Sequence, residues 1–433
     1  MAETPEVPFP EEQCPQTPPA AKAILRRVEQ PAARAPSART RTARLAEGGS
    51  LVGRSRPLAE PLYQTTVWAF GSGDDVDAWY EGRAPGTHLY YRNGNPNMAS
   101  LEAALADLEG GESAASAGSG MAAIAAGFLA IVGAGDHIVA DRACYGGTTV
   151  LLREEFARLG IEHTLVDATD CDAVRDAMRT NTRVLHVESI SNPLLRCPDL
   201  PRLASIARDR GALLSVDNTF ASPILMRPIE HGADLVTHSL AKYLGGSSVA
   251  VGGIVIGSRG LIDGARARLV RLGATIGAFD AWMALQGMKT LALRMEAHSA
   301  NARAVAHALD RHPGIAAVHF PELPGHPDRA VVGRLYPTGC GGMVSFDVGS
   351  AAAARALLAE VSRAGIPLAP SLADTRTTVS YPAGTSHRAL SLAERRAIGV
   401  TDGLIRLSVG IESPEDIVTD LDRALRVART GAR

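Results

Sequence analysis

The sequence predicts an α/β protein: a mostly parallel sheet flanked by helices, followed by a smaller C-terminal α+β domain. Two features predict this class. Between about residues 97 and 290, short apolar runs of strand length alternate with longer segments of helical periodicity, which is the pattern of a parallel sheet with helices on both faces. After about residue 290, a long helix leads into strands that are fewer and farther apart. Ligands of such parallel sheets bind beyond the carboxyl ends of the strands.

Each predicted strand of the first domain is a short apolar run bounded by polar or turn-forming residues. The strands are expected at 113–117, 137–140, 164–166, 183–187, 213–216, 235–237 and 253–256. The helices repeat apolar residues every three or four positions. They are expected at 98–108, 121–132, 150–159 and 200–210.

The second domain begins with the long helix predicted at 291–309. Its other elements are strands at 318–320, 342–347 and 404–409 and a helix at 351–363. We therefore expect a large domain over residues 97–292 and a C-terminal domain over 293–433.

The first 56 residues differ in composition from the rest of the chain. They are rich in proline, alanine and arginine and have few apolar residues, so they can bury little surface. We expect residues 1–56 to be a solvated, partly disordered extension, with a functional arm as the alternative. Residues 57–96 connect it to the large domain.

Composition restricts the classes of partner. The chain has 433 residues, of which 46% are apolar and 21% charged, and its net charge is −2. This balance argues against nucleic acid or an anionic membrane as the main partner, and no apolar run is long enough to cross a bilayer. The start of the chain lacks the pattern of a signal peptide. Five scattered cysteines without a Cys-x-x-Cys pair indicate neither a zinc site nor a disulfide framework. We expect a cytoplasmic protein.

The most informative segment is 238–246, which contains Lys242. It follows a short apolar strand, and its lysine is preceded by serine and followed by glycines. A second apolar strand, 213–216, ends on Asp217. An amine that can form a Schiff base and a carboxylate that can hold a pyridinium nitrogen are the two groups that pyridoxal phosphate requires. A solvated lysine and a helix-capping aspartate are the simpler alternatives.

A glycine-rich turn at 117–123 lies between a predicted strand and a helix. It fits the dinucleotide pattern G-x-G-x-x-G/A, and Asp136 and Asp141 lie near the expected place of a ribose-binding acid. It is equally a helix N-terminus whose free N–H groups bind one phosphate, or a packing turn. Lys242 and Asp217 favour the phosphate of pyridoxal phosphate.

Three further side chains suit such a site. Tyr145 follows a strand, where its ring could stack on a planar cofactor and its hydroxyl could transfer a proton; core filling is the alternative. Arg92 lies in the loop 89–96 beside two tyrosines and could bind phosphate, or lie in a surface turn. Arg406 lies within an apolar strand, where its charge requires a partner: a substrate carboxylate or a structural ion pair.

Together these segments resemble the cysteine/methionine-metabolism family of pyridoxal-phosphate enzymes, which includes cystathionine γ-synthase, cystathionine γ-lyase, methionine γ-lyase and the homoserine-ester sulfhydrylases. The resemblance covers roughly residues 58–428. Each motif is weak alone, but their order along the chain is specific. The matching segments are 61–66, 90–96, 119–121, 145–148, 188–193, 216–219, 239–243, 289–295 and 405–410.

The resemblance implies PLP fold type I and a set of cofactor contacts. Lys242 would form the Schiff base, Asp217 would hold the pyridinium nitrogen and Tyr145 would stack on the ring. The implied phosphate ligands are Gly120, Met121 and Ser239 of the same chain, together with Tyr90 and Arg92 of a neighbouring subunit. The family thus implies that residues 57–96 form an N-terminal arm that contacts the neighbouring subunit. It also implies a homotetramer, a dimer of dimers with shared active sites.

The resemblance also implies the substrate contacts. Asn192, Ser371 and Arg406 would bind the substrate carboxylate, and Asn192 would also approach the oxygen on the cofactor ring. Arg376 replaces an acid found in typical γ-synthases and γ-lyases. It would disfavour a distal amine and suit an anionic or neutral side chain, so we count it among the substrate-binding residues.

The chain departs from the family at three other places. Ala241 replaces a second phosphate-binding hydroxyl, at a cost of about 1 kcal/mol if nothing else donates. Residues 246–249 read Gly-Ser-Ser-Val where many members have Gly-His-Ser-Asp. Gly147 replaces the thiol common in methionine γ-lyases, which weighs against that activity.

The expected reaction is γ-replacement on an L-homoserine ester or a related γ-substituted amino acid, a step of methionine biosynthesis. The alternatives within the family are γ-elimination, as in cystathionine or methionine γ-lyases, and a specialised reaction on a nonstandard amino acid. Outside it, a nicotinamide dehydrogenase and a cofactor-binding subunit without catalysis of its own remain open.

Overall fold

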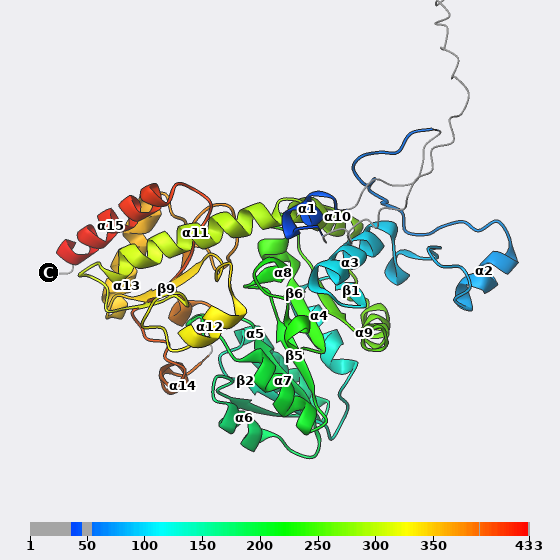
Figure 1. Ribbon diagram of the computed structural model, residues 1–433, viewed down its shortest axis with the longest axis horizontal. Helices are drawn as coiled ribbons and strands as arrows, with labels where there is room; N and C mark the ends of the chain where they lie inside the picture. Colours follow the sequence, from blue (N-terminus) through cyan, green and yellow to red (C-terminus); the bar gives the residue numbers. More distant parts are fainter. Residues whose placement is uncertain (1–35, 46–53, 389, 432–433) are drawn as a thin grey trace, which may run out of the picture. The chain divides into compact units, whose positions relative to one another are not determined.

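The structure is a computed structural model that describes residues 36–45, 54–388 and 390–431. Its centre is a seven-stranded sheet with the order β1-β7-β6-β5-β4-β2-β3, in which β7 alone runs antiparallel to its neighbours (Figure 1). The strands are β1 (Ser113–Ala117), β2 (His137–Asp141), β3 (Glu162–Val166), β4 (Thr182–Glu188), β5 (Leu213–Asp217), β6 (Leu235–Ser239) and β7 (Gly253–Gly257). All seven strands predicted for this domain are therefore confirmed, with ends that differ by two residues or fewer.

Helices cover both faces of this sheet. They are α3 (Pro96–Glu109), α4 (Gly120–Leu129), α5 (Gly146–Val150), α6 (Cys171–Ala177), α7 (Leu200–Asp209), α8 (Ser222–Leu225), α9 (Arg259–Leu272) and α10 (Ala278–Met288). On one face, α4 and α9 pack on Ala115, Leu235 and Val255. On the other, α3, α7 and α10 pack on a core that includes Val216 and Val236. The strands are apolar on both sides because both sides are buried.

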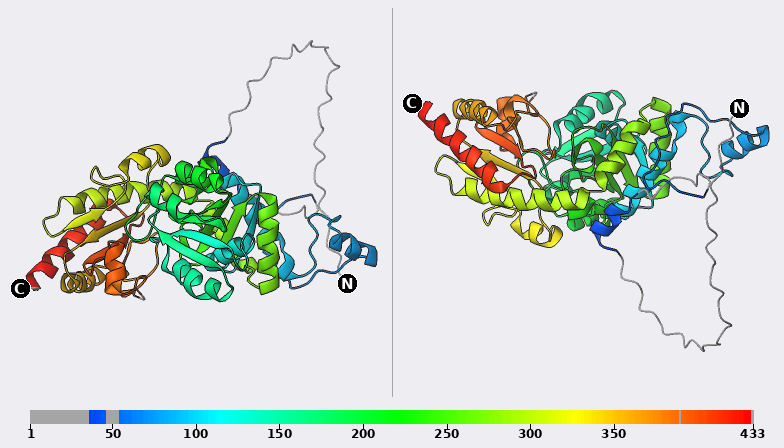
Figure 2. Two further views of the ribbon diagram at one scale, coloured as in Figure 1. Left: turned by 90° about the horizontal axis from the view of Figure 1, so that it is seen from below. Right: turned by 90° about the horizontal axis from the view of Figure 1, so that it is seen from above.

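The second sheet has four antiparallel strands in the order β10-β11-β9-β8. They are β8 (Ala317–His319), β9 (Met343–Asp347), β10 (Thr378–Ser380) and β11 (Leu404–Ser408). Three helices form a core with one face of this sheet: α11 (Leu291–Asp310), α13 (Ala351–Arg363) and α15 (Pro414–Gly431). Figures 1 and 2 show α11 extending from the large sheet into the small domain.

Alternation along β11 decides which side chains face the large domain. Ile405 and Leu407 join the core beneath the helices, so Arg406 points to the opposite face. Ser345 of β9 lies opposite Arg406 in the strand register, and its hydroxyl donates to the carbonyl of Pro193 at 2.6 Å. The polar face of the small sheet therefore meets the carboxyl edge of the large one.

Several helices were not predicted, and one was predicted with the wrong form. The expected helix at 150–159 is α5 followed by a π-helical segment, Leu151–Phe156. The helix α9 escaped prediction because arginines and glycines separate its apolar residues Ile262, Ala265 and Leu269, which nevertheless share one buried face. The other unpredicted elements are α2 (Gly73–Tyr80), α6, α8, α10, α12 (Arg329–Leu335), α14 (Leu392–Ala397), α15 and β10.

Part of the N-terminal extension is folded. Residues Ala38–Ala43 form a helix, α1, capped by the hydroxyl of Ser37. Arg41 pairs with Asp107 of α3 at 2.8 Å, and Thr42 is buried. Residues 36–45 therefore contain a short helix that contacts the large domain, while most of their side chains are exposed, and the partly disordered extension stays a prediction. Residues 1–35 and 46–53 lie outside the described part of the chain. Across the described ranges, no helix is both long and apolar enough to span a membrane.

Candidate active site

A cavity of about 690 Å³ lies beyond the carboxyl ends of β4, β5 and β6, where both domains contribute to its wall. Its position is the one predicted for a ligand of a parallel sheet. The large domain contributes Ser119, Gly120, Met121, Tyr145, Glu188, Asn192, Asp217, Thr219, Ser239, Ala241 and Lys242, among others. The small domain contributes Pro370, Ser371, Leu372, Gly384, Thr385, Ser386, Arg388 and Arg406.

Lys242 follows β6 in a short π-helical segment, Leu240–Leu244, and departs from helical geometry with φ −112° and ψ −137°. Its ammonium group donates to the hydroxyl oxygen of Ser371 at 3.0 Å, across the two domains. Burial, and then the nearby charge of Arg406, lowers the pKa of Lys242. A lower pKa leaves more of the amine neutral and nucleophilic near neutral pH.

Two carboxyl groups lie side by side in the cavity wall, at the ends of neighbouring strands. Asp217 at the end of β5 is directly opposite Glu188 at the end of β4. Asp217 accepts from the backbone N–H of Thr219 at 3.0 Å, and Glu188 accepts from that of Tyr145 at 2.5 Å. Burial raises the pKa of Asp217; burial and the charge of Asp217 raise that of Glu188. Within the described ranges, neither forms an ion pair with a side chain, so a cationic ring nitrogen would supply the missing charge.

The first turn of α4 and the end of β6 form a cradle for an anion. The hydroxyl of Ser119 caps α4 by accepting from the N–H of Ala122 at 3.1 Å, and the N–H groups at the start of a helix have no partner inside it. A Cβ on Gly120 would lie 3.0 Å from the Cβ of Ser239. Glycine therefore lets the first turn of α4 approach the end of β6 closely, and the free N–H groups of this turn beside the hydroxyl of Ser239 fit a phosphate.

Replacing Gly120 with alanine should weaken binding of pyridoxal phosphate by about 5- to 150-fold, because crowding of about 1–3 kcal/mol falls on the cradle. Equilibrium titration of the apoprotein with the cofactor measures this change. The control is Gly133→Ala, since a Cβ on Gly133 would meet nothing within 4 Å. Equal affinities for the two variants would contradict the assignment of the cradle.

Arg406 is buried between the domains and is held from two sides. One terminal nitrogen donates to the side-chain oxygen of Asn192 at 2.9 Å, and the other to the carbonyl of Ser371 at 3.0 Å. Its Nε is buried and has no partner within the described residues. Burial lowers the pKa of Arg406 to about 10. An unpaired donor on a buried cation beside Lys242 suits the carboxylate of an amino-acid substrate.

The remaining predicted residues fall into two groups. Tyr145 lines the cavity with 46% of its surface exposed. Tyr90 and Arg92 do not line it; Arg92 lies over the ring of Tyr90, 5.6 Å from its centroid. Arg376 is exposed and absent from the wall, and its guanidinium donates to the carbonyl of Gly365 at 2.6 Å. Tyr90, Arg92 and Arg376 therefore do not make the predicted contacts within a single chain.

No sequence pattern indicated a role for Glu188, Thr219 or Arg388. Glu188 could have been found, because it ends a predicted strand as Asp217 does. Thr219 could not, because its contact is local and polar: its hydroxyl accepts from the N–H of Ser239 at 2.9 Å. Arg388 lies in a loop with no periodic pattern, so only the folded chain brings it to the cavity.

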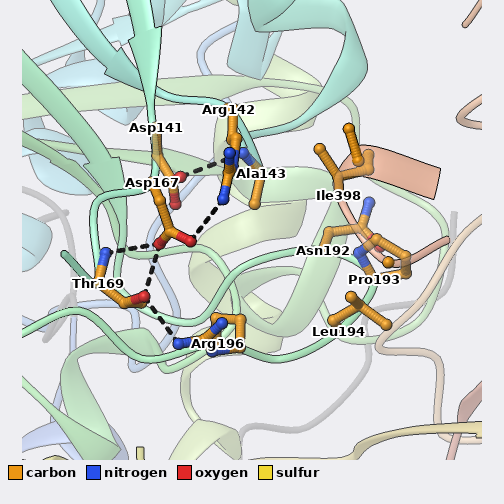
Figure 3. A pocket seen from close by; sticks show the side chains of 12 residues that line it. Asp141, Arg142, Ala143, Asp167, Thr169, Asn192, Pro193, Leu194, Arg196 and Ile398 are labelled. Atoms are coloured by element: carbon orange, nitrogen blue, oxygen red, sulfur yellow. Dashed lines mark hydrogen bonds and ion pairs between the residues drawn. The ribbon is translucent and has the colours of Figure 1, made fainter. Parts of the chain in front are cut away.

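A second, smaller cavity of about 220 Å³ shares Asn192 with the first (Figure 3). Its arginines are both paired with acids. Arg142 pairs with Asp167 at 2.7 Å, and Arg196 pairs with Asp328, also at 2.7 Å. We therefore assign the chemistry of the site to the larger cavity.

The fold and the larger cavity define an enzyme of the pyridoxal-phosphate class, fold type I, with a smaller antiparallel C-terminal sheet. Residues 42–426 match the family model described as Cys/Met metabolism PLP-dependent enzyme. The chain belongs to this family, and its cofactor is pyridoxal 5′-phosphate.

Named relatives place the chain among enzymes of sulfur amino acids. It is 39% identical to an L-methionine gamma-lyase of Fusobacterium nucleatum subsp. polymorphum over 87% of this chain and 95% of the relative. It is also 39% identical to an O-succinylhomoserine sulfhydrylase of Pseudomonas aeruginosa, over 84% and 90%. A Campylobacter jejuni structure that carries N′-pyridoxyl-lysine-5′-monophosphate superposes with a TM-score of 0.84 at 30% identity, covering 90% of this chain and all of the other.

Proposed function

We propose that the protein catalyses γ-replacement on an L-homoserine ester or a closely related γ-substituted amino acid. The observation that carries the proposal is the meeting of Lys242, Asp217 and Arg406 in one cavity that both domains form. The similarity to an O-succinylhomoserine sulfhydrylase supports it. The similarity to methionine γ-lyases favours γ-elimination as the second candidate.

Five residues of the same chain would hold the cofactor. Lys242 would bind it covalently, Asp217 would pair with its ring nitrogen, and the cradle at Gly120 and Ser239 would bind its phosphate. Tyr145 would lie against its ring. Bound there, pyridoxal phosphate supplies an electron sink that stabilises negative charge at carbons of the amino acid.

The side chains of the protein would orient the substrate and move its protons. Arg406, fixed by Asn192, binds the α-carboxylate, which presents Cα to Lys242. The lowered pKa of Lys242 lets its free amine take the Cα proton. Ser371, which accepts from this amine at 3.0 Å, keeps it in place. The hydroxyl of Tyr145 can assist the second proton transfer at Cβ.

Replacement and elimination differ in whether a thiol or a proton reaches the same carbon, so exclusion of water decides between them. Two segments that depart from the family pattern contact each other. The hydroxyl of Ser248 bonds to the carboxylate of Asp374, which joins the unusual loop after Lys242 to the segment that contains Arg376. This contact links two of the departures from the family pattern.

The reaction is tested by incubating the holoenzyme with O-acetyl- and O-succinyl-L-homoserine, with cystathionine and with methionine, each with and without sulfide. Mass spectrometry then identifies the products. Homocysteine formed only when an ester and sulfide are both present supports replacement. Ammonia and a 2-oxo acid formed without a thiol would favour elimination, and no product from any compound would favour a specialised substrate.

We also propose that the enzyme is a homotetramer with shared active sites, working in the cytoplasm in methionine biosynthesis. Tyr90 and Arg92 support sharing, since they do not line the cavity of their own chain. The helix α2 precedes Tyr90 and Arg92 within residues 57–96, and none of its residues is buried. Residues 57–96 therefore offer a surface that a neighbouring subunit could cover.

Mixing two inactive variants tests this sharing. If Arg92 serves the neighbouring site, hybrids of Arg92→Ala and Lys242→Ala chains contain one intact site, and random assembly restores about a quarter of the wild-type activity. Hybrids of Lys242→Ala and Asp217→Asn chains should stay inactive, because both residues serve their own chain. Recovery in the second mixture, or none in the first, contradicts shared sites.

A further inference from the structure

We propose that Arg388 is a specificity-determining residue that binds a carboxylate beyond Cγ, at the far end of the substrate. The inference rests on the proposed γ-replacement and names the class of substrate: a γ-substituted amino acid that carries a second carboxylate. The residues that support it all line the cavity described above.

The acids and the arginines that line the cavity come from different domains, and Lys242 is the cation that the large domain contributes. The two carboxyl groups, Glu188 and Asp217, end neighbouring strands of the large sheet. The small domain contributes two cations to the lining, Arg388 and Arg406, and no acid. One α-carboxylate on Arg406 therefore leaves a positive charge unmatched on the substrate side.

The loop that carries Arg388 is fixed by its backbone. The N–H of His387 donates to the carbonyl of Pro382 at 2.9 Å, and that of Arg388 to Thr385 at 3.2 Å. His387 is buried, and its ring bonds to the hydroxyl of Ser386 at 2.8 Å. The base of the Arg388 side chain is therefore held at the rim of the cavity.

The guanidinium of Arg388, in contrast, has no ion pair and no hydrogen bond to any described residue. Its neighbour Arg395 is paired with Asp402 at 3.0 Å, and Arg406 has two acceptors. A planar, unpaired guanidinium at a cavity rim matches the geometry of a carboxylate, which it can bind through two parallel hydrogen bonds.

Arg376 is an arginine of the small domain outside the cavity, and it provides the matched control. Its side chain is exposed, donates to the carbonyl of Gly365 and does not line the cavity. A carboxylate inside the cavity should therefore depend on Arg388 and not on Arg376.

The distal carboxylate has two possible sources. It belongs either to the leaving group, as in the succinyl ester of homoserine, or to the incoming nucleophile, as in cysteine. Steady-state kinetics separates them. One arm compares O-succinyl- with O-acetyl-L-homoserine at saturating sulfide; the other compares cysteine with sulfide at saturating O-acetyl-L-homoserine. Each arm uses the wild type, Arg388→Leu, Arg388→Lys and Arg376→Leu.

Loss of a charged hydrogen-bonding partner predicts that Arg388→Leu raises KM by about 10-fold or more for the compound with the distal carboxylate. The KM of its uncharged counterpart and both kcat values should change little, and Arg388→Lys should recover part of the loss. A selective effect in the first arm assigns the leaving group, and one in the second assigns the nucleophile. Equal effects on both compounds of each pair, or the same effect from Arg376→Leu, would overturn the proposal.

A binding measurement separates this inference from the proposed reaction. L-2-Aminosuberate carries a distal carboxylate and no leaving group, whereas L-2-aminooctanoate has the same chain length without it. Their dissociation constants follow from the change in cofactor absorbance on titration. A preference for aminosuberate that Arg388→Leu abolishes supports the inference even if no ester is turned over, in which case only the proposed reaction fails. The absence of any preference in the wild type overturns the inference.

Discussion

Replacing Lys242 with alanine should lower turnover by at least about a thousandfold and abolish covalent attachment of the cofactor. The lysine is the amine that binds the cofactor and the base that takes the Cα proton, and general-base catalysis alone contributes ~10²–10⁴-fold. Its position favours both roles: it is the amine in the cavity wall, and burial together with Arg406 lowers its pKa.

Covalent attachment of the cofactor can be assigned to a single residue, because the chain contains only three lysines, Lys22, Lys242 and Lys289. Borohydride reduction of the wild-type holoenzyme should fix one pyridoxyl group, which peptide mass spectrometry should locate at Lys242. Lys289→Arg, the matched control, should label and turn over as the wild type does. Label on Lys289, or normal activity of Lys242→Ala, would refute the assignment.

Replacing Asp217 with asparagine should reduce kcat/KM by roughly 30-fold to several thousandfold. The change keeps the shape of the side chain but removes the charge that pairs with the ring nitrogen, and loss of one partner from a buried charged pair costs about 2–5 kcal/mol. The absorbance of the bound cofactor should shift as well, since its ring nitrogen loses the partner that keeps it protonated. Spectral titration with pH provides this readout independently of turnover.

Asp141→Asn is the control for Asp217→Asn. Asp141 also ends a buried strand, and burial raises its pKa to about 6. It lies in the smaller cavity, where its carboxylate accepts from the N–H of Ala143 at 3.1 Å. The control should therefore leave the cofactor spectrum unchanged. A similar spectral shift in both variants would mean that the effect comes from general loss of a buried charge.

The sequence predicted the elements whose patterns are local. The strands of the large sheet are mostly apolar because both faces are buried, although buried polar residues such as His186 and Ser215 interrupt them, so length and composition were sufficient. Asp217 directly follows the run 213–216 and Lys242 comes five residues after the run 235–237, so both were found from their place after a strand. Helices such as α9, in which polar and apolar residues are interspersed, were missed. Tertiary packing, not helix propensity, selects the side of such a helix that is buried.

The resemblance named Asn192, Ser371 and Arg406, but the hydrogen bonds that hold these residues depend on the contact between domains. The hydrogen bonds that join Lys242 to Ser371 and Arg406 to Asn192 span 129 and 214 residues of sequence, and no local pattern encodes such distances. The same holds for arginines in loops. Arg376 was singled out because of its place in a motif, whereas the fold brings Arg388 to the cavity and leaves Arg376 outside.

The continuous helix α11 has a consequence for how the protein unfolds. Leu291 and Met295 near its start belong to the core of the large sheet, while Val305 and Leu309 near its end belong to the core of the small one. Each core includes side chains from one part of this helix. Unfolding of either end of the helix therefore also removes packing from the core at its other end. The two sheets should therefore lose their structure in a single cooperative thermal transition. A protein truncated near residue 292, where the two domains meet, should not fold stably.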